Sequence, residues 1–170
     1  QCLEVLLQSE WLELQQDFQA LLERLQDYRG LQTAARSVDC EIEDGVTLTG
    51  QVRSCYPGIG LMHFSASKSV KSRALLTLWL QHLALCAGGK LAETETSQLI
   101  TAQDNGIRYR KIAASDARVL LSDYFELFRI GLEFPLPVFP DTSYAWARET
   151  DPEQAMQKAI QKAMLQPVNG

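Results

Sequence analysis

The chain has 170 residues, of which 46% are hydrophobic, and a formal net charge of −5. This size and composition predict one globular domain with a buried core. No apolar run approaches the ~20 residues that cross a bilayer, and no signal-peptide pattern opens the chain. The cysteines, Cys2, Cys40, Cys55 and Cys86, lack paired C-x-x-C spacing. We therefore expect reduced, structural thiols in a cytoplasmic protein rather than a zinc site or disulfides.

The charges are unevenly distributed along the chain. Residues 1–44 carry ten acids and three bases, residues 45–92 carry five bases and no acid, and the remainder carries eleven acids and eight bases. An acid-free segment of this length in an acidic protein is typical of a surface that binds a polyanion. It is equally typical of buried helix and strand, from which charges of both signs are excluded. Both interpretations stay open at this point.

The N-terminal part predicts a surface helix followed by a hairpin. Ser9 is a candidate cap for a helix that runs to about Tyr28 and ends at Gly30. The segments VDCEI and VTLTGQVRSCY, joined by Asp44-Gly45, predict two strands of a hairpin, and LMHFSA predicts the next strand. Apolar residues of the helix recur at alternating steps of three and four and draw one stripe: Trp11, Leu14, Phe18, Leu21, Leu25 and Tyr28.

The rest of the chain predicts two long helices and a second hairpin. Residues 71–87 are apolar nearly all round and stop at Gly88-Gly89, which is typical of a helix buried within a domain. SQLITA and IRYRKI, separated by QDNG, predict the second hairpin, and Ser115 is a candidate cap for the long helix after it. Three prolines exclude a helix over FPLPVFP, and Asp151 opens a last polar helix.

These elements predict a mixed α/β domain, with a central mixed sheet of about five strands flanked by four or five helices. We expect an N-terminal amphipathic helix and linker over residues 1–38, a core over residues 39–148, and a C-terminal helix over residues 149–170. Because the chain begins at Gln1 and stops at LQPVNG, we expect it to be cut from a longer polypeptide, with its last helix truncated.

The strand pattern between residues 46 and 66 predicts the register of the central hairpin. A slip of one residue would turn an apolar face to solvent, so the apolar faces must match. Cys55 then lies on the polar face of its strand, and a three-residue loop over residues 57–59 joins the strands. The facing pairs, with Cβ atoms ~5 Å apart, are Val52 with Phe64, Arg53 with His63, and Gln51 with Ser65.

Three motifs carry a family resemblance. DGVTLTGQV, LTLWLQHLALCAGG and GLEFPLPVFPDTSYAWA resemble, in order and spacing, the C-terminal region of RecC, the gamma subunit of bacterial exodeoxyribonuclease V (RecBCD). The resemblance covers residues 39–147. It implies a restriction-endonuclease-like fold of the RecB nuclease type, without the active site.

The resemblance also implies which residues replace the catalytic ones. Active relatives hold magnesium with two carboxylates, because this ion takes hard oxygen ligands, and use a lysine beside the attacked phosphate. Arg53 and His63 stand at the places of the acids and Ser65 at the place of the lysine. We therefore expect no catalysis, metal or cofactor in this domain on its own, although its holoenzyme would be an ATP-dependent helicase and exonuclease.

The implied role is in double-strand-break repair by homologous recombination. The domain would brace RecB-type and RecD-type subunits and guide split DNA strands, with weak binding of forked duplex or single strands by the isolated domain and no membrane partner. Two alternatives stay open. One is a protein-docking scaffold that does not contact DNA. The other is an active metal-dependent nuclease with relocated ligands on Asp39, Glu41, Glu43 and Asp44.

Several further residues are candidates for contacts. Tyr109 would alternate with its basic neighbours across a predicted strand and is the aromatic candidate for base stacking, although a charged edge strand explains the same pattern. His82 and Cys86 have a spacing that can join two metal ligands, but a core histidine is favoured because no second pair exists. We expect Trp79 in the core and Trp146 to pin the proline segment. The candidates for DNA contact are Lys68, Lys71, Arg73, Arg108, Tyr109, Arg110 and Lys111.

Overall fold

The structure, a computed structural model, describes residues 2–102, 106–136 and 140–148, with side chains from residue 10 onward. These ranges contain four α-helices, one 3-10 turn and five strands. In chain order they are α1 (Cys2–Arg24), η1 (Gln26–Tyr28), β1 (Ala34–Glu43), β2 (Val46–Tyr56), β3 (Gly60–Ser65), α2 (Ser72–Ala87), β4 (Thr96–Thr101), β5 (Ile107–Arg110), α3 (Ala114–Glu133) and α4 (Pro140–Ala147). Within the same ranges, no helix is both long and apolar enough to cross a membrane.

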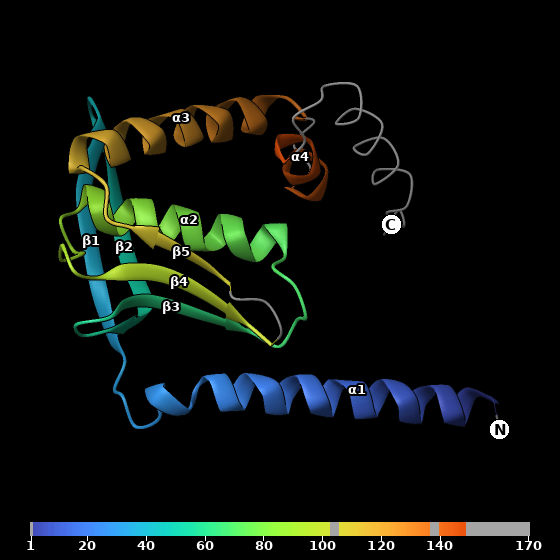
Figure 1. Cartoon of the computed structure of the whole chain (residues 1–170). Helices are drawn as coiled ribbons and strands as arrows, with labels where there is room; N and C mark the ends of the chain where they lie inside the picture. The colour runs from blue at the N-terminus through green and yellow to red at the C-terminus, as the bar shows by residue number, and fades with distance from the viewer. Residues whose placement is uncertain (1, 103–105, 137–139, 149–170) are drawn as a thin grey trace.

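The strands form one mixed sheet, which confirms the predicted fold class. Their order is β1-β2-β3-β4-β5, and every neighbouring pair is antiparallel except β3 and β4. Parallel neighbours need a crossover connection, and here α2 supplies it. Figure 1 shows β1 and β2 as a long two-stranded arm that crosses the direction of β3, β4 and β5.

Helices lie on both sides of the sheet. Figure 1 shows α2 and α3 on one side of the β3–β5 part and α1 on the other, with the N-terminal half of α1 projecting past the strands. The contacts agree, because α2 packs against β4 and α3 while α3 also contacts β1. The core therefore lies between α2 and the sheet.

Helix α2 is buried as its apolar sequence predicts. Six consecutive residues, His82 to Ala87, are buried at its C-terminal end. The helix stops at Gly88, and Gly89 adopts a positive φ of 63° that favours glycine. Three of the cysteines, Cys40, Cys55 and Cys86, are free thiols in this core, which confirms the structural role predicted for them.

The predicted helix boundaries need correction. Helix α1 begins at Cys2, so Ser9 lies inside it rather than capping it. Helix α3 begins at Ala114 with Ala113 at the cap position, and the Ser115 hydroxyl donates to Asp116 in the first turn. Pro140 is the first residue of α4, a position that suits proline because the first helical N–H needs no partner.

Two predictions for the last part of the chain stay predictions. Trp146 lies on α4 with 56% of its surface exposed, but residues 137–139 of the proline segment that it was expected to pin lie outside the described residues. Phe134 of the same segment is exposed as well. The predicted helix from Asp151 lies outside the described residues.

Candidate functional site at the β2–β3 hairpin

The hairpin has the predicted register at its turn. Cys55 pairs with Leu61 and Tyr56 with Gly60, and residues 57–59 form the three-residue loop. The pairing stops after these two pairs, whereas β3 pairs with β4 along its whole length. The predicted pairs Val52–Phe64, Arg53–His63 and Gln51–Ser65 are therefore wrong as strand neighbours, although they continue the observed register.

A β-bulge in β2 explains why the pairing stops. Arg36 of β1 pairs with Val52, and Ala34 pairs with Cys55. Between these two pairs β2 therefore contains one residue more than β1. Within this stretch Ser54 has a φ of 61°. A bulge of this kind bends and twists its strand. It also changes the face on which later side chains lie, so Cys55 is fully buried rather than on the polar face predicted for it.

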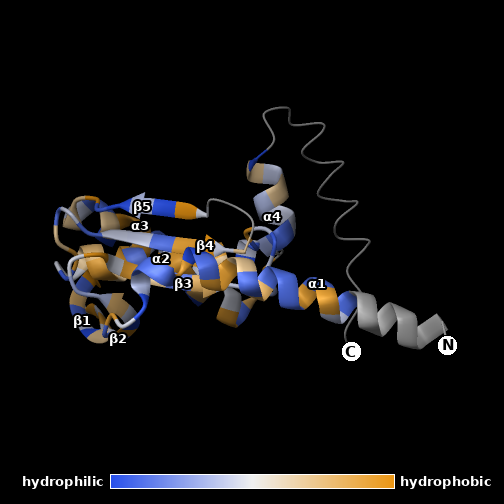
Figure 2. Cartoon of the chain, turned by 60° about the horizontal axis from the view of Figure 1, so that its bottom comes forward, coloured by the Kyte–Doolittle hydropathy of each residue, from blue (hydrophilic) through white to orange (hydrophobic). Residues whose placement is uncertain are grey.

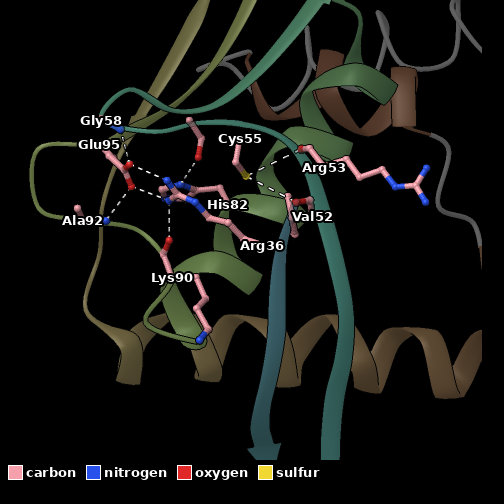
Figure 3. Close-up of polar contacts among 10 residues, drawn as sticks. Arg36, Val52, Arg53, Cys55, Gly58, His82, Lys90, Ala92 and Glu95 are labelled. Carbon is pink, nitrogen blue, oxygen red and sulfur yellow. Dashed lines mark hydrogen bonds and ion pairs between the residues drawn. The ribbon is translucent and has the colours of Figure 1, made fainter. Parts of the chain in front are cut away.

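The three positions at which the active site is predicted to be degenerate have different partners. Arg53 is exposed on the bulge, and Figure 3 shows its side chain directed away from the polar network nearby. His63 is half-buried, with Nε2 2.8 Å from Oε1 of Gln81. The Ser65 hydroxyl accepts a hydrogen bond from the backbone N–H of Ser67 at 3.3 Å. Each side chain thus has its own surroundings, and none of the three supplies a carboxylate.

The acids considered as relocated ligands are spread along the surface of the β1–β2 hairpin. All four are exposed: Asp39, Glu41, Glu43 and Asp44. Glu41 accepts a hydrogen bond from the Gly45 N–H, and Glu43 accepts one from the Ser122 hydroxyl at 2.7 Å. Among the residues that the structure describes, no three His, Cys, Asp or Glu side chains come close enough to share a metal ion.

A buried ion pair, which the sequence analysis missed, stands beside the hairpin (Figure 3). Arg36 on β1 donates from both terminal nitrogens to the two carboxylate oxygens of Glu95, each at 2.6 Å. The carboxylate also accepts from the N–H groups of Gly58 and Ala92, both at 3.0 Å. Arg36 donates further to the carbonyl of Lys90 at 2.6 Å. The pair therefore joins β1, the β2–β3 turn and the loop after α2.

The surroundings of Glu95 strongly favour its charged form. Its side chain is only 5% exposed. The hydrogen bonds from the Arg36 guanidinium, opposed by burial and supported by the Ala92 and Gly58 N–H groups, lower the pKa of Glu95 to about 2. No local pattern could have revealed this pair, because its partners lie 59 residues apart in the chain.

Several candidates for DNA contact are engaged by the protein itself. Lys68 lies 2.9 Å from Glu13 and 3.8 Å from Asp17 of α1, and Lys111 lies 2.7 Å from Glu93. Arg108 donates to the amide oxygen of Gln98 at 3.1 Å. Tyr109 points inward, with its ring 4.8 Å from that of Trp79 and 5.5 Å from that of His82. Its role as a stacking platform for bases stays a prediction, because the ring is half-buried against these two side chains.

Three candidate cations form no salt bridge with an acid among the described residues. Lys71 and Arg73, at the start of α2, and Arg110, on the edge strand β5, are all exposed. Lys71 and Ile107, the first residue of β5, line the same pocket, together with Asp141 of α4. Arg110 is the last residue of β5 and pairs with Thr96 at the start of β4, so it lies away from this pocket. Arg148 of α4 lines this pocket as well; the sequence analysis did not single it out.

His82 is a core residue. The sequence analysis favoured this role over that of a metal ligand. It is fully buried, with Nδ1 2.9 Å from the Ser97 hydroxyl and Nε2 3.6 Å from Cys86 Sγ. Its ring stacks on Trp79 at 5.5 Å between centroids. Burial lowers the pKa of His82, so its neutral form is favoured. Trp79 is half-buried and packs against the core, in line with its prediction.

The fold and the site define an α/β domain with a five-stranded mixed sheet and a bulged hairpin that has Arg53, His63 and Ser65 at its candidate positions. The chain matches the family model of the RecC C-terminal domain over residues 5–151, and it belongs to this family. It is 33% identical over 105 residues to RecBCD enzyme subunit RecC of Escherichia coli (strain K12). This match covers 62% of the chain and 9% of the relative, so the chain spans about a tenth of the length of the curated relative.

Proposed function

We propose that this chain is a nuclease-like domain without catalytic activity in a RecC-type subunit of a RecBCD helicase-nuclease. In this role it braces RecB-type and RecD-type subunits and guides split DNA strands during double-strand-break repair by homologous recombination. ATP hydrolysis on other subunits supplies the motor energy. Membership of the RecC C-terminal domain family supports the assignment to such a complex.

One observation carries the non-catalytic part of the proposal. The three positions that would hold two acids and a lysine hold Arg53, His63 and Ser65. A guanidinium repels magnesium, and each carboxylate that is absent removes an attraction of a few kcal/mol at an effective dielectric near 20. The bulge at Arg53 and Ser54 adds to this, because it ends the pairing that would bring the two strands face to face.

The strand-guiding part rests on the cations that the protein leaves without an acidic partner. Lys71 and Arg73 are exposed at the N-terminal end of α2, and Arg110 is exposed at the end of β5. Contacts from such side chains to phosphates position nucleic acid without reading its sequence. They also make the binding depend on salt, because each neutralised phosphate releases counterions. A surface of this kind suits strands whose sequence varies from one substrate to the next.

Forked DNA tests the strand-guiding proposal. We expect weak, salt-dependent binding in fluorescence anisotropy, and the combined variant Lys71→Gln, Arg73→Gln, Arg110→Gln should lower the salt slope by about one for each residue. Lys90→Gln is the matched control, since Lys90 is an exposed lysine just beyond the other end of α2. An equal loss in the control and the triple variant, or no loss in either, would favour a scaffold that never meets DNA.

The same preparations distinguish the active-nuclease alternative. That alternative requires cleavage of linear DNA with magnesium or manganese, abolished by Glu43→Gln or Asp44→Asn. Our proposal expects no cleavage by the purified chain under any of these conditions. Metal-dependent cleavage that disappears in these two variants would overturn the non-catalytic assignment and leave the DNA-binding result untouched.

A further inference from the structure

Helix α1 carries an apolar stripe of which the described structure covers only one half. The spacing of the stripe residues alternates between three and four, which is the pattern of a seam between packed helices. At the inner end Leu21 is buried, with 6% of its surface exposed. At the outer end Trp11, Leu14 and Phe18 are 60%, 52% and 53% exposed. The stripe is thus one continuous feature with two different environments.

Polar contacts along one side of α1 attach it to the domain. At the inner end Arg24 donates to the carbonyl of Thr101 at 3.4 Å, and toward the outer end Lys68 lies 2.9 Å from Glu13. The acidic side of α1 therefore faces the body, and the outer stripe lies beside this contact. Figure 2 shows α1 extending well beyond the sheet, with hydrophobic and hydrophilic residues interleaved along its described part.

The outer stripe forms an apolar groove without charge. Six residues line it, four large apolar side chains and two neutral amides: Trp11, Leu14, Gln15, Phe18, Gln19 and Leu22. Transient interfaces have polar rims, whereas permanent ones resemble a domain core cut in half. Large apolar side chains that gather on one exposed surface can indicate an interaction site. The groove thus has the composition of a permanent packing surface.

We propose that a helix of the same RecC-type polypeptide, from outside residues 1–170, packs into this groove. Two observations indicate an occupant from the same polypeptide. The groove continues, in the same spacing, a stripe whose inner end already packs within the chain. The matched relative also has far more polypeptide than this domain, because the match covers only 9% of it. The occupant would carry apolar residues at steps of three and four. The inference uses family membership and is independent of the strand-guiding proposal.

Two leucines on α1 provide a matched pair for the test. Leu14 lies in the groove and Leu12 does not, although their exposed fractions, 52% and 57%, are nearly equal. In the full-length subunit, purified without its partners, Leu14→Glu should raise amide exchange over residues 10–22 by about tenfold or more, which corresponds to losing one buried apolar contact. Leu12→Glu should leave the exchange near that of the unmodified subunit.

A second measurement keeps the inference testable if Leu14→Glu prevents folding. Leu14→Cys in the full-length subunit should resist maleimide labelling, while Leu12→Cys should react at the rate of an exposed thiol. Equal labelling of both positions would overturn the proposal. Protection of position 14 that arises only after RecB-type and RecD-type subunits are added, or only with rising subunit concentration, would overturn it too, because another polypeptide or a second copy would then cover the groove.

Discussion

At the scale of single residues, the Arg36–Glu95 pair links three separate segments of the described chain. It is bidentate, nearly buried, and completed by N–H groups from two separate loops. Bidentate charge-assisted hydrogen bonds have both strength and fixed geometry. Removing one partner of such a pair leaves a buried charge uncompensated, which costs far more than removing an exposed pair.

We therefore expect Glu95→Gln to destabilise the domain by about 3 kcal/mol and to lower Tm by about 10 °C. Glu93→Gln is the control, because Glu93 is 85% exposed in its pair with Lys111 and should cost less than about 1 kcal/mol. Chemical denaturation of both variants gives the comparison. Equal losses in the two variants would contradict the importance given to burial.

The same pair predicts how stability depends on pH. The pKa of Glu95 is about 2 in the folded chain against an ordinary value of 4.5, so the unfolded chain takes up the proton first as pH falls. The stabilisation is complete above about pH 5 and is lost progressively between about pH 5 and pH 2. In this window the difference between the unmodified chain and Glu95→Gln should shrink. A difference that stays constant down to pH 2 would argue against the depressed pKa.

At the scale of elements, local patterns predicted most strands and the buried helix. The turn glycine Gly45, the apolar run of α2 and the alternation in β5 are local signals, and the structure confirms all three elements. The bulge at Ser54 was missed because its register depends on how β1 pairs with β2, which no single strand reveals. The start of α1 was missed because the residues before Ser9 include strong helix formers. They continue the helix through Ser9, which resembled a cap.

Gly60 tests the junction at which β3 meets both of its neighbours. It has a φ of 113°, and an added Cβ would lie 2.0 Å from the carbonyl oxygen of Thr96. Gly60→Ala should therefore cost several kcal/mol, through strain and loss of the β3–β4 contact. Gly50→Ala, with nothing within 4 Å of the added Cβ, should be close to neutral. The measurement is the unfolding free energy of both variants. Near-equal values would contradict the close approach of the Gly60 backbone to Thr96.

At the scale of the whole molecule, distant segments decide which candidate residues are free to act. Lys68 lies in the acid-free segment, yet α1 supplies its acidic partners from more than 50 positions earlier in the chain. Tyr109 alternates with arginines as predicted, but its ring packs against Trp79 of α2. The sequence could therefore name the candidate residues of the site. It could not separate free cations from engaged ones, because that depends on tertiary contacts between remote segments.

The alkylation rate of the three buried thiols can report how often the core opens. Burial raises the pKa of Cys40, Cys55 and Cys86, and alkylation requires both a thiolate and access for the reagent. With Cys2 replaced by serine, alkylation would proceed only when the layer between α2 and the sheet opens. The labelling rate therefore counts opening events directly. Cys55 is next to the bulge in β2, and Cys86 lies within α2. A comparison of their labelling rates would therefore tell whether the core opens first at the sheet or at the helix.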